Sequence, residues 1–181
     1  MRGPDITDDD HFRGAERPRV TLVEYGDYDC PHTRRAQSSV DRLVAENADV
    51  RIVFRHFPLR DLHANAEILS RVAEAAALQG RFWAIHDHLM SHRAPIDERG
   101  VLADAADAGV DMERVRRDVG LDAVARRIER DVRSGRARGI HSTPSFLFDG
   151  VLHDGHYDFE TLARKLEDAR RTGDTPAKER R

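Results

Sequence analysis

The chain is poor in the residues on which several classes of protein depend. Of its 181 residues one is cysteine, one is tryptophan, and 6% are aromatic. A single cysteine rules out a disulfide within the chain and, with no apolar leader at the N-terminus, points to a reducing compartment. A cytoplasmic location is therefore expected. No apolar run has the length needed to cross a bilayer, so no membrane partner is expected either.

Neither sign of charge dominates the sequence. Lys and Arg number 30 against 33 Asp and Glu, for a formal net charge of -3, and charged residues make up 35% of the chain. Basic residues are scattered among acids without a basic and aromatic stripe, so nucleic acid is not an expected partner. The length suits one domain, with or without an insertion, and allows a core without cross-links.

The only cysteine stands where a predicted strand turns into a predicted helix. Residues 20–25 are rich in β-branched and aromatic types, and helical periodicity begins just after Cys30. Pro31 suits the first helical turn, where its missing N–H is not needed. Cys30 would then face the free N–H groups and positive end of the helix, which favour a reactive thiolate. The alternative is that Cys30 is only a small apolar residue of the core. Its position at a helix start argues against such burial.

The rest of the chain predicts an α/β protein. Helical spacing continues to about residues 46–47, and a second apolar strand follows at 50–56, so strand, helix and strand form a right-handed parallel unit. Residues 63–138 then show only helical patterns, including a helix around Leu102. A helical block of this size is typical of an insertion between two halves of a sheet.

Strand signals return after the helical block. Residues 145–148 and 151–153 flank Asp149 and Gly150. This two-residue turn strongly predicts a β-hairpin, because both of its positions accept positive φ. Apolar residues at helical spacing then predict a final helix that starts near Phe159.

The residues around Cys30 resemble the active site of the DsbA-like thiol-disulfide oxidoreductases, which reads Cys-Pro-His-Cys after a strand. Here the sequence is Cys-Pro-His-Thr, with Thr33 in place of the second cysteine. The resemblance implies a thioredoxin fold, a central mixed sheet flanked by helices, with an inserted helical subdomain. It also implies a cis-proline beside the cysteine, a role that falls to Pro144 against the alternative of an ordinary trans-proline. Thr143 before it would hold an extended substrate by backbone hydrogen bonds.

The resemblance and the order of elements together divide the chain into parts. Residues 18–62 and 139–171 are expected to form the thioredoxin-fold domain, and residues 63–138 the inserted helical subdomain. Residues 1–17 are expected to be a polar extension without a core of its own, and residues 172–181 a disordered charged tail.

Three residues near Cys30 receive catalytic roles from the resemblance. Glu24, six residues earlier, matches an acid that relays a proton beneath the site; alternatively it is paired at a strand edge. His32 matches a histidine that stabilises the thiolate, or it is a solvated loop residue. Thr33 lies one helical turn from Cys30, so its hydroxyl is placed to donate to the thiolate, unless it marks decay of the motif. A hydroxyl does not replace the resolving cysteine in thiol exchange.

Histidines elsewhere in the chain predict no metal site. His86, His88 and His92 fall on one expected helix, and the last two are one turn apart. Two imidazoles need further ligands, and no spacing or cysteine marks any. His56 and His63 flank an expected loop and are more naturally hydrogen-bonded or solvated. No bound cofactor is expected.

The leading hypothesis is a single-cysteine thiol-disulfide oxidoreductase. The Cys30 thiolate attacks a disulfide of a protein or small molecule, and an external thiol, glutathione or another low-molecular-weight thiol, resolves the mixed disulfide. Two alternatives stay open: a redox-inactive, chaperone-like module that holds extended peptides at Thr143 and Pro144, and an enzyme that conjugates glutathione to electrophiles. A monomer or a homodimer is expected, and a homodimer would bring two copies of Cys30 together.

Overall fold

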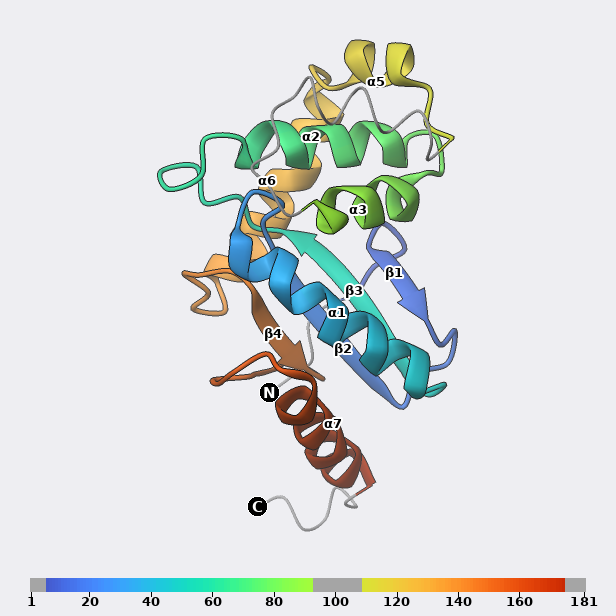
Figure 1. The fold of residues 1–181 in the computed structure, drawn as a ribbon, viewed down its shortest axis with the longest axis vertical. Coiled ribbons are helices and arrows are strands. Elements are labelled where there is room, and N and C mark those ends of the chain that lie inside the picture. The colour runs from blue at the N-terminus through green and yellow to red at the C-terminus, as the bar shows by residue number, and fades with distance from the viewer. Residues whose placement is uncertain (1–5, 93–108, 175–181) are drawn as a thin grey trace. The chain divides into compact units, whose positions relative to one another are not determined.

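The computed structural model describes residues 6–92 and 109–174 of the chain (Figure 1). Their contacts divide the chain into two compact units. The first unit comprises the chain up to residue 24, residues 36–54, and the chain from residue 145 onward; the second comprises residues 25–35 and 55–144. Among the helices of the described ranges, none is both long and apolar enough to cross a membrane.

The sheet has five strands in the order β1-β3-β2-β4-β5 (Figure 1). Strands β2 (Val20–Gly26) and β3 (Val50–His56) are buried at all but one position each, as their β-branched and aromatic residues predict. Helix α1 (Pro31–Glu46) connects these two neighbouring strands. The predicted strand-helix-strand order and the predicted end of the first helix are therefore confirmed.

The β-hairpin expected from the Asp149-Gly150 turn is present. Strands β4 (Ser145–Phe148) and β5 (Val151–Leu152) pair antiparallel. Asp149 and Gly150 have φ values of 47° and 84°, as a two-residue turn of this kind requires. The Asp149 carboxylate also accepts a hydrogen bond from the N–H of Thr21, at 2.8 Å. The turn is thus tied to strand β2.

Strand β1 (His11–Gly14) lies within the segment 1–17 that the sequence predicts as an extension without a core. It forms one edge of the sheet and pairs antiparallel with β3, with Phe12 opposite Val53. The expected extension is therefore corrected for these residues. Pairing at a sheet edge depends on backbone hydrogen bonds, so a short polar strand can pair there without an apolar pattern.

Helix α7 (Phe159–Asp174) packs on β4 in the first unit (Figure 1). At its start, the guanidinium of Arg42 lies over the Phe159 ring, 3.6 Å from the centroid, which joins α7 to α1. At its other end, Nε of Arg170 donates to the Asp49 carboxylate at 3.0 Å. The helix includes residues 172–174, which the sequence assigns to a disordered tail. The core of this unit contains the fully buried side chains of Leu22, Leu43, Phe54, Leu147 and Leu162.

The second unit contains the helices α2 (Ala66–Ala77), α3 (Phe82–Ser91), α5 (Met112–Asp118) and α6 (Asp122–Arg136). Helix α2 packs against each of the other three. The helical pattern predicted after residue 63 is therefore confirmed in the described part of that stretch, whereas the helix predicted around Leu102 lies outside the described residues. Fully buried side chains here include Leu69, Ile85, Leu89 and Ile128.

Helix α6 approaches the beginning of the second unit closely at Gly135. A Cβ at this position would lie 2.8 Å from the Phe57 ring and 3.1 Å from the Tyr25 ring. One residue earlier, the Ser134 hydroxyl is hydrogen-bonded to the Tyr25 hydroxyl at 2.7 Å. The Tyr25 hydroxyl also accepts a bond from Arg55, at 3.1 Å. Helix α6 thus packs against the end of β2, before the cysteine turn, and against the end of β3.

Candidate functional site

Cys30 forms the N-terminal cap of helix α1. Its carbonyl accepts the backbone N–H of Arg34 at 3.2 Å, and its own N–H donates to the Asp27 carbonyl at 3.1 Å. Pro31 occupies the first helical position, where a proline costs no hydrogen bond. The cysteine therefore stands at the helix end whose N–H groups lack partners within the helix.

The second unit brings Cys30 together with Thr143 and Pro144, although 113 residues separate Cys30 from Thr143 along the chain. The thiol donates to the Thr143 carbonyl, with Sγ and O 3.4 Å apart. The Thr143-Pro144 peptide bond is cis. The Thr143 hydroxyl is buried and has no hydrogen-bond partner in the described part of the chain. The Cys30 sulfur thus contacts the backbone of Thr143, whose hydroxyl is open to a further hydrogen bond.

Cys30 is more buried than its position at a helix start suggests. Only 3% of the residue is exposed, so the expectation from sequence that this position opposes burial is not met. The burial comes from contacts of tertiary structure, which helix position alone does not report. Little of the residue is therefore open to a substrate sulfur.

The Asp27 carboxylate organises the turn that precedes the cysteine. Its side chain is fully buried and accepts three hydrogen bonds: from the N–H of Asp29 at 2.9 Å, from the N–H of Leu59 at 3.0 Å, and from Nδ1 of His63 at 2.7 Å. The Asp29 carboxylate accepts the N–H of Asn65 at 2.9 Å. Two acids of the cysteine turn therefore hold the loop 59–65 in place, since each accepts backbone donors that water would otherwise satisfy.

Asp27 and His63 were missed as site residues by sequence reasoning. The signal for Asp27 is the Gly-Asp-Tyr-Asp run before the cysteine, because Asp side chains bond backbone N–H groups in turns. No comparable signal exists for His63, which lies 36 residues away from Asp27 in the chain. The expectation that His63 is hydrogen-bonded or solvated is confirmed by the bond to Asp27.

Thr33 is buried, and its hydroxyl oxygen accepts the backbone N–H of Asp27 at 3.4 Å. The sequence predicts instead a bond from this hydroxyl to Cys30. In the described part of the chain the thiol donates to Thr143, and no hydrogen bond joins it to Thr33. Because the Thr33 oxygen accepts, its proton stays available to an acceptor that arrives later. His32 is exposed on the first turn of α1.

Glu24 lies on β2 in the first unit, whereas the cysteine and Thr143 belong to the second. Its carboxyl group is fully buried, and neither oxygen has a hydrogen-bond partner among the described residues. Burial raises the pKa of Glu24 from 4.5 to about 8, and the negative charge of Asp41 adds to this. The alternative of a carboxylate paired at a strand edge does not apply, because β2 is an inner strand. Glu24 is therefore a neutral acid at neutral pH.

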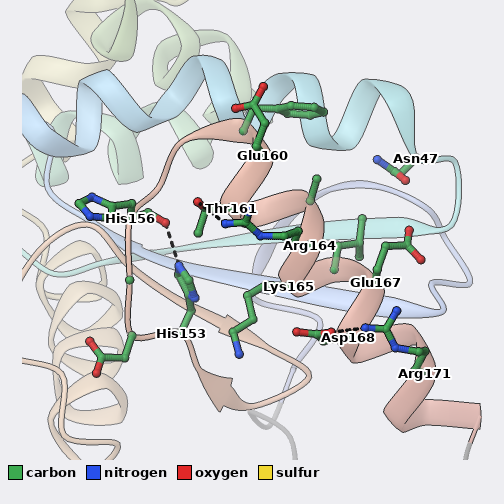
Figure 2. Close-up of a pocket in the computed structure, with 15 residues that line it drawn as sticks. Asn47, His153, His156, Glu160, Thr161, Arg164, Lys165, Glu167, Asp168 and Arg171 are labelled. Carbon is green, nitrogen blue, oxygen red and sulfur yellow. Dashed lines mark hydrogen bonds and ion pairs between the residues drawn. The ribbon is translucent and has the colours of Figure 1, made fainter.

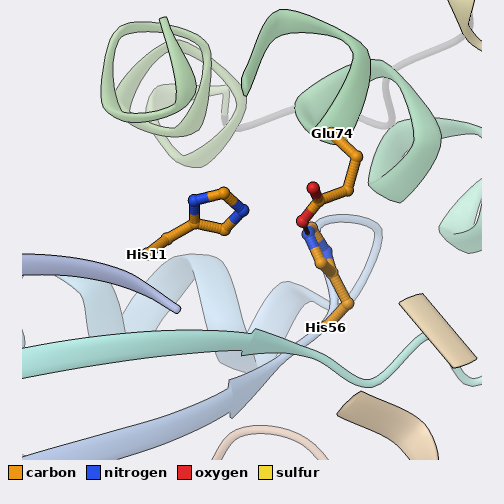
Figure 3. A group of neighbouring side chains, drawn as sticks. All are labelled: His11, His56 and Glu74. Carbon is orange, nitrogen blue, oxygen red and sulfur yellow. Dashed lines mark hydrogen bonds and ion pairs between the residues drawn. The ribbon is translucent and has the colours of Figure 1, made fainter. Parts of the chain in front are cut away.

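A polar cluster is buried among the helices of the second unit. Nε2 of His56 lies 2.8 Å from the Glu74 carboxylate (Figure 3), and the His56 N–H donates to the Asp131 carboxylate at 3.0 Å. Burial raises the pKa of Asp131 although the cation of Arg127 opposes the rise. Buried polar and charged groups are stable in a protein where they are paired. We therefore assign this cluster a structural role and not a catalytic one. The expectation that His56 is hydrogen-bonded is confirmed.

A surface pocket lies in the first unit, between helix α7 and the chain that leads into it from β5 (Figure 2). It contains none of the site residues predicted from the sequence. Nε2 of His153 donates to the His156 carbonyl at 2.9 Å across its rim. The lining carries both signs of charge, and Arg171 binds Asp168 within it.

Comparison with protein families gives one match that covers most of the chain. A family model described as thioredoxin matches residues 6–168. A solved structure of a thioredoxin-like oxidoreductase from Silicibacter pomeroyi DSS-3 is 32% identical, with a TM-score of 0.84 over 91% of this chain and 94% of that one. BdbD from Bacillus subtilis is 18% identical, with a TM-score of 0.79 over 94% and 97% of the two chains, and this likeness concerns the fold.

Curated relatives are longer proteins. The Na⁺/H⁺ antiporter NhaA of Herminiimonas arsenicoxydans is 39% identical over 163 residues, which is 90% of this chain and 26% of the antiporter. The antiporter NhaA 1 of Salinispora arenicola is 36% identical over 162 residues, 90% of this chain and 25% of that protein. The chain thus spans about a quarter of the length of these relatives.

Proposed function

Because this chain belongs to the thioredoxin family, we propose that it is a DsbA-like thiol-disulfide oxidoreductase in which Cys30 alone carries the reaction. One observation supports this most strongly: Cys30 stands directly before helix α1, and its thiol donates to the carbonyl of Thr143, 3.4 Å away, beside Pro144. The helix end favours the thiolate. The neighbouring backbone supplies hydrogen-bonding groups for an extended substrate.

The proposed reaction has two exchange steps. The Cys30 thiolate attacks one sulfur of a substrate disulfide; that S–S bond breaks, and the other substrate sulfur leaves as a thiolate and takes up a proton. A small thiolate such as glutathione then attacks the substrate sulfur of the mixed disulfide. Cys30 leaves as a thiolate, and the substrate sulfur departs in a new disulfide with the small thiol. An external thiol is required, since the chain contains no second cysteine.

Neighbouring side chains have distinct parts in this proposal. The Thr33 hydroxyl, whose oxygen already accepts the Asp27 N–H, keeps a proton to donate to the Cys30 thiolate. His32 is exposed on the same helical turn, where its protonated form stabilises a nearby anion. Glu24 holds a proton up to about pH 8, and its proposed role is that of a proton-relaying acid.

The proposal is tested by the rate at which glutathione disulfide modifies Cys30. The folded protein and the same protein unfolded in urea are treated in parallel at neutral pH, and intact mass records the adduct. The unfolded chain is the matched control, because it carries the same thiol without the helix end. We expect the folded protein to react faster, with one glutathione per chain that reduced glutathione removes. A folded protein that reacts more slowly than the unfolded one would refute an activated thiol.

The burial of Cys30, at 3% exposed, favours a second candidate, a redox-inactive module that binds extended peptides at Thr143 and Pro144. The substitution Cys30→Ala separates the two functions. A binding module keeps its affinity for an unfolded, cysteine-free polypeptide such as reduced and alkylated casein, measured by fluorescence anisotropy. An oxidoreductase instead catalyses disulfide exchange as the wild type and loses that activity with the same substitution, whereas a redox-inactive module has no such activity in either form.

A further inference from the structure

His88 and His92 bring their imidazole rings together at the C-terminal end of helix α3. Their Nε2 atoms are 3.1 Å apart. The ring centroids are 4.7 Å apart, and the ring planes cross at 80°. Both side chains are half-buried. The two nitrogens that most often bind metals in proteins therefore face each other across one helical turn.

We propose that His88 and His92 form a two-imidazole site for a divalent transition-metal ion. Zinc binds imidazole nitrogen at about 2.0–2.1 Å, so two such nitrogens on one tetrahedral or octahedral ion stand roughly 2.9–3.4 Å apart. The observed separation of 3.1 Å lies inside this range. The rings thus need little movement to share an ion.

The position of the two histidines at a helix end also favours a bound cation. His88 lies in the last turn of α3, and His92 is the residue that caps it. The C-terminal end of a helix carries a partial negative charge, which favours a nearby cation. The Ser91 hydroxyl donates to the His88 carbonyl at 2.7 Å and so restrains the backbone between the two ligands. Water or a group of a partner would complete the coordination shell.

Ligand chemistry narrows the choice of ion. Imidazole suits Zn²⁺, Ni²⁺ and Cu²⁺, whereas Mg²⁺ and Ca²⁺ prefer oxygen ligands. Among these ions Cu²⁺ binds tightest to a given set of nitrogen ligands. In the absence of an ion, one neutral ring donates its Nε2 proton to the other. An ion uses both Nε2 lone pairs, so that proton moves to Nδ1 of its own ring. The ion-free and ion-bound pairs therefore differ in which ring nitrogen carries the proton.

From the sequence, His88 and His92 are expected to bind no metal. The spacing of His88 and His92 indicates a shared helix face, and the requirement for further protein ligands then argues against a metal. Facing nitrogens at this distance form a chelate without a third side chain. Affinity is correspondingly lower than in closed structural sites, which use four protein ligands.

The test uses Cu²⁺ and Zn²⁺ with the full chain carrying Cys30→Ser, because a thiolate is itself a metal ligand. Titration calorimetry at about pH 7.5 gives the affinity, and the nitrogen hyperfine pattern in electron paramagnetic resonance counts the imidazoles on Cu²⁺. We expect one ion per chain held by two imidazole nitrogens. His88→Gln and His92→Gln should each weaken binding at least tenfold, and acidification should weaken it because both rings must be unprotonated.

His156→Gln is the matched control, because His156 is an exposed histidine of the first unit and should leave the affinity unchanged. Circular dichroism verifies that each variant is folded. Wild-type affinity in the double variant of His88 and His92 would overturn the proposal. So would a spectrum with fewer than two imidazole nitrogens, which needs no variant at all.

Discussion

At the scale of single residues, the environment of each ionisable group decides what it can do. The Cys30 thiol is bound by a backbone carbonyl, whereas the Asp27 carboxylate is stabilised by backbone and imidazole donors. Glu24 has no such donors, so burial acts on it without compensation. Glu24 therefore keeps its proton at neutral pH.

Glu24 makes stability depend on pH. In the unfolded chain it ionises near its ordinary pKa of 4.5, whereas in the folded protein its pKa is about 8. Between these values the folded state keeps a proton that the unfolded state releases, so the free energy of unfolding falls by about 1.4 kcal/mol per pH unit as pH rises. Glu24→Gln abolishes this contribution. The variant should therefore become progressively more stable than the wild type from about pH 5 to about pH 8.

Urea unfolding of both proteins across that range measures the difference. Glu167→Gln is a suitable control, since the Glu167 side chain is 54% exposed. If the wild type and the Glu24 variant lost stability in parallel as pH rose, the ionisation of Glu24 would not be linked to folding.

At the scale of elements, the turn before Cys30 is held by the three hydrogen bonds that the Asp27 carboxylate accepts. Asp27→Asn replaces one accepting oxygen of the carboxylate by an NH₂ group, which only donates. This NH₂ group would face the N–H of Leu59 or of Asp29, so that two donors oppose each other. We expect the free energy of unfolding to fall by at least about 2 kcal/mol, because buried donors are left without an acceptor. His63→Gln removes one donor only and should cost less. Chemical denaturation of the two variants compares these losses.

The same Asp27 variant should change how fast glutathione disulfide modifies Cys30, since the Cys30 N–H is bound to the Asp27 carbonyl. An Asp27→Asn protein with unaltered stability and unaltered modification rate would show that the carboxylate does not hold the turn.

Helix α6 is expected to be sensitive to a single methyl group. Gly→Ala inside a helix ordinarily stabilises by about 1 kcal/mol. At Gly135 the added Cβ would meet the Phe57 ring at 2.8 Å, so Gly135→Ala should instead destabilise by about 1–3 kcal/mol. Gly173→Ala in α7, where a Cβ meets nothing within 4 Å, is the matched control and should not destabilise. Thermal unfolding distinguishes the outcomes, and equal melting temperatures for both variants would argue against the close approach of α6.

At the scale of the whole molecule, the sheet extends further toward the N-terminus than apolar patterning indicates. Strand β1 covers one side of β3. A deletion that starts the chain at Pro18 should expose that side, lower the free energy of unfolding by more than about 1 kcal/mol and promote self-association through the open edge. Phe12→Ser keeps the backbone pairing and serves as the control. Denaturation and light scattering test both, and a stable monomeric deletion variant would contradict the role of β1.

Much of the fold was predictable because its signals are local. The buried strands, the first helix and the Asp149-Gly150 turn each follow from the conformational preferences of residues adjacent in the chain. The position of Cys30 directly before Pro31 is local in the same way. Strand β1 escaped prediction because its pairing depends on β3, 36 or more residues away, and not on its own polar residues.

By itself the sequence determined the order of helices and strands from β2 onward and the place of its one thiol at a helix start, because these depend on neighbours within a turn or a strand. Only the tertiary structure decided that the thiol is buried against Thr143, that His63 binds Asp27, and that Glu24 keeps its proton. Each of these needs groups far apart in the chain, or the exclusion of water by the folded core, and no local pattern of residues specifies either.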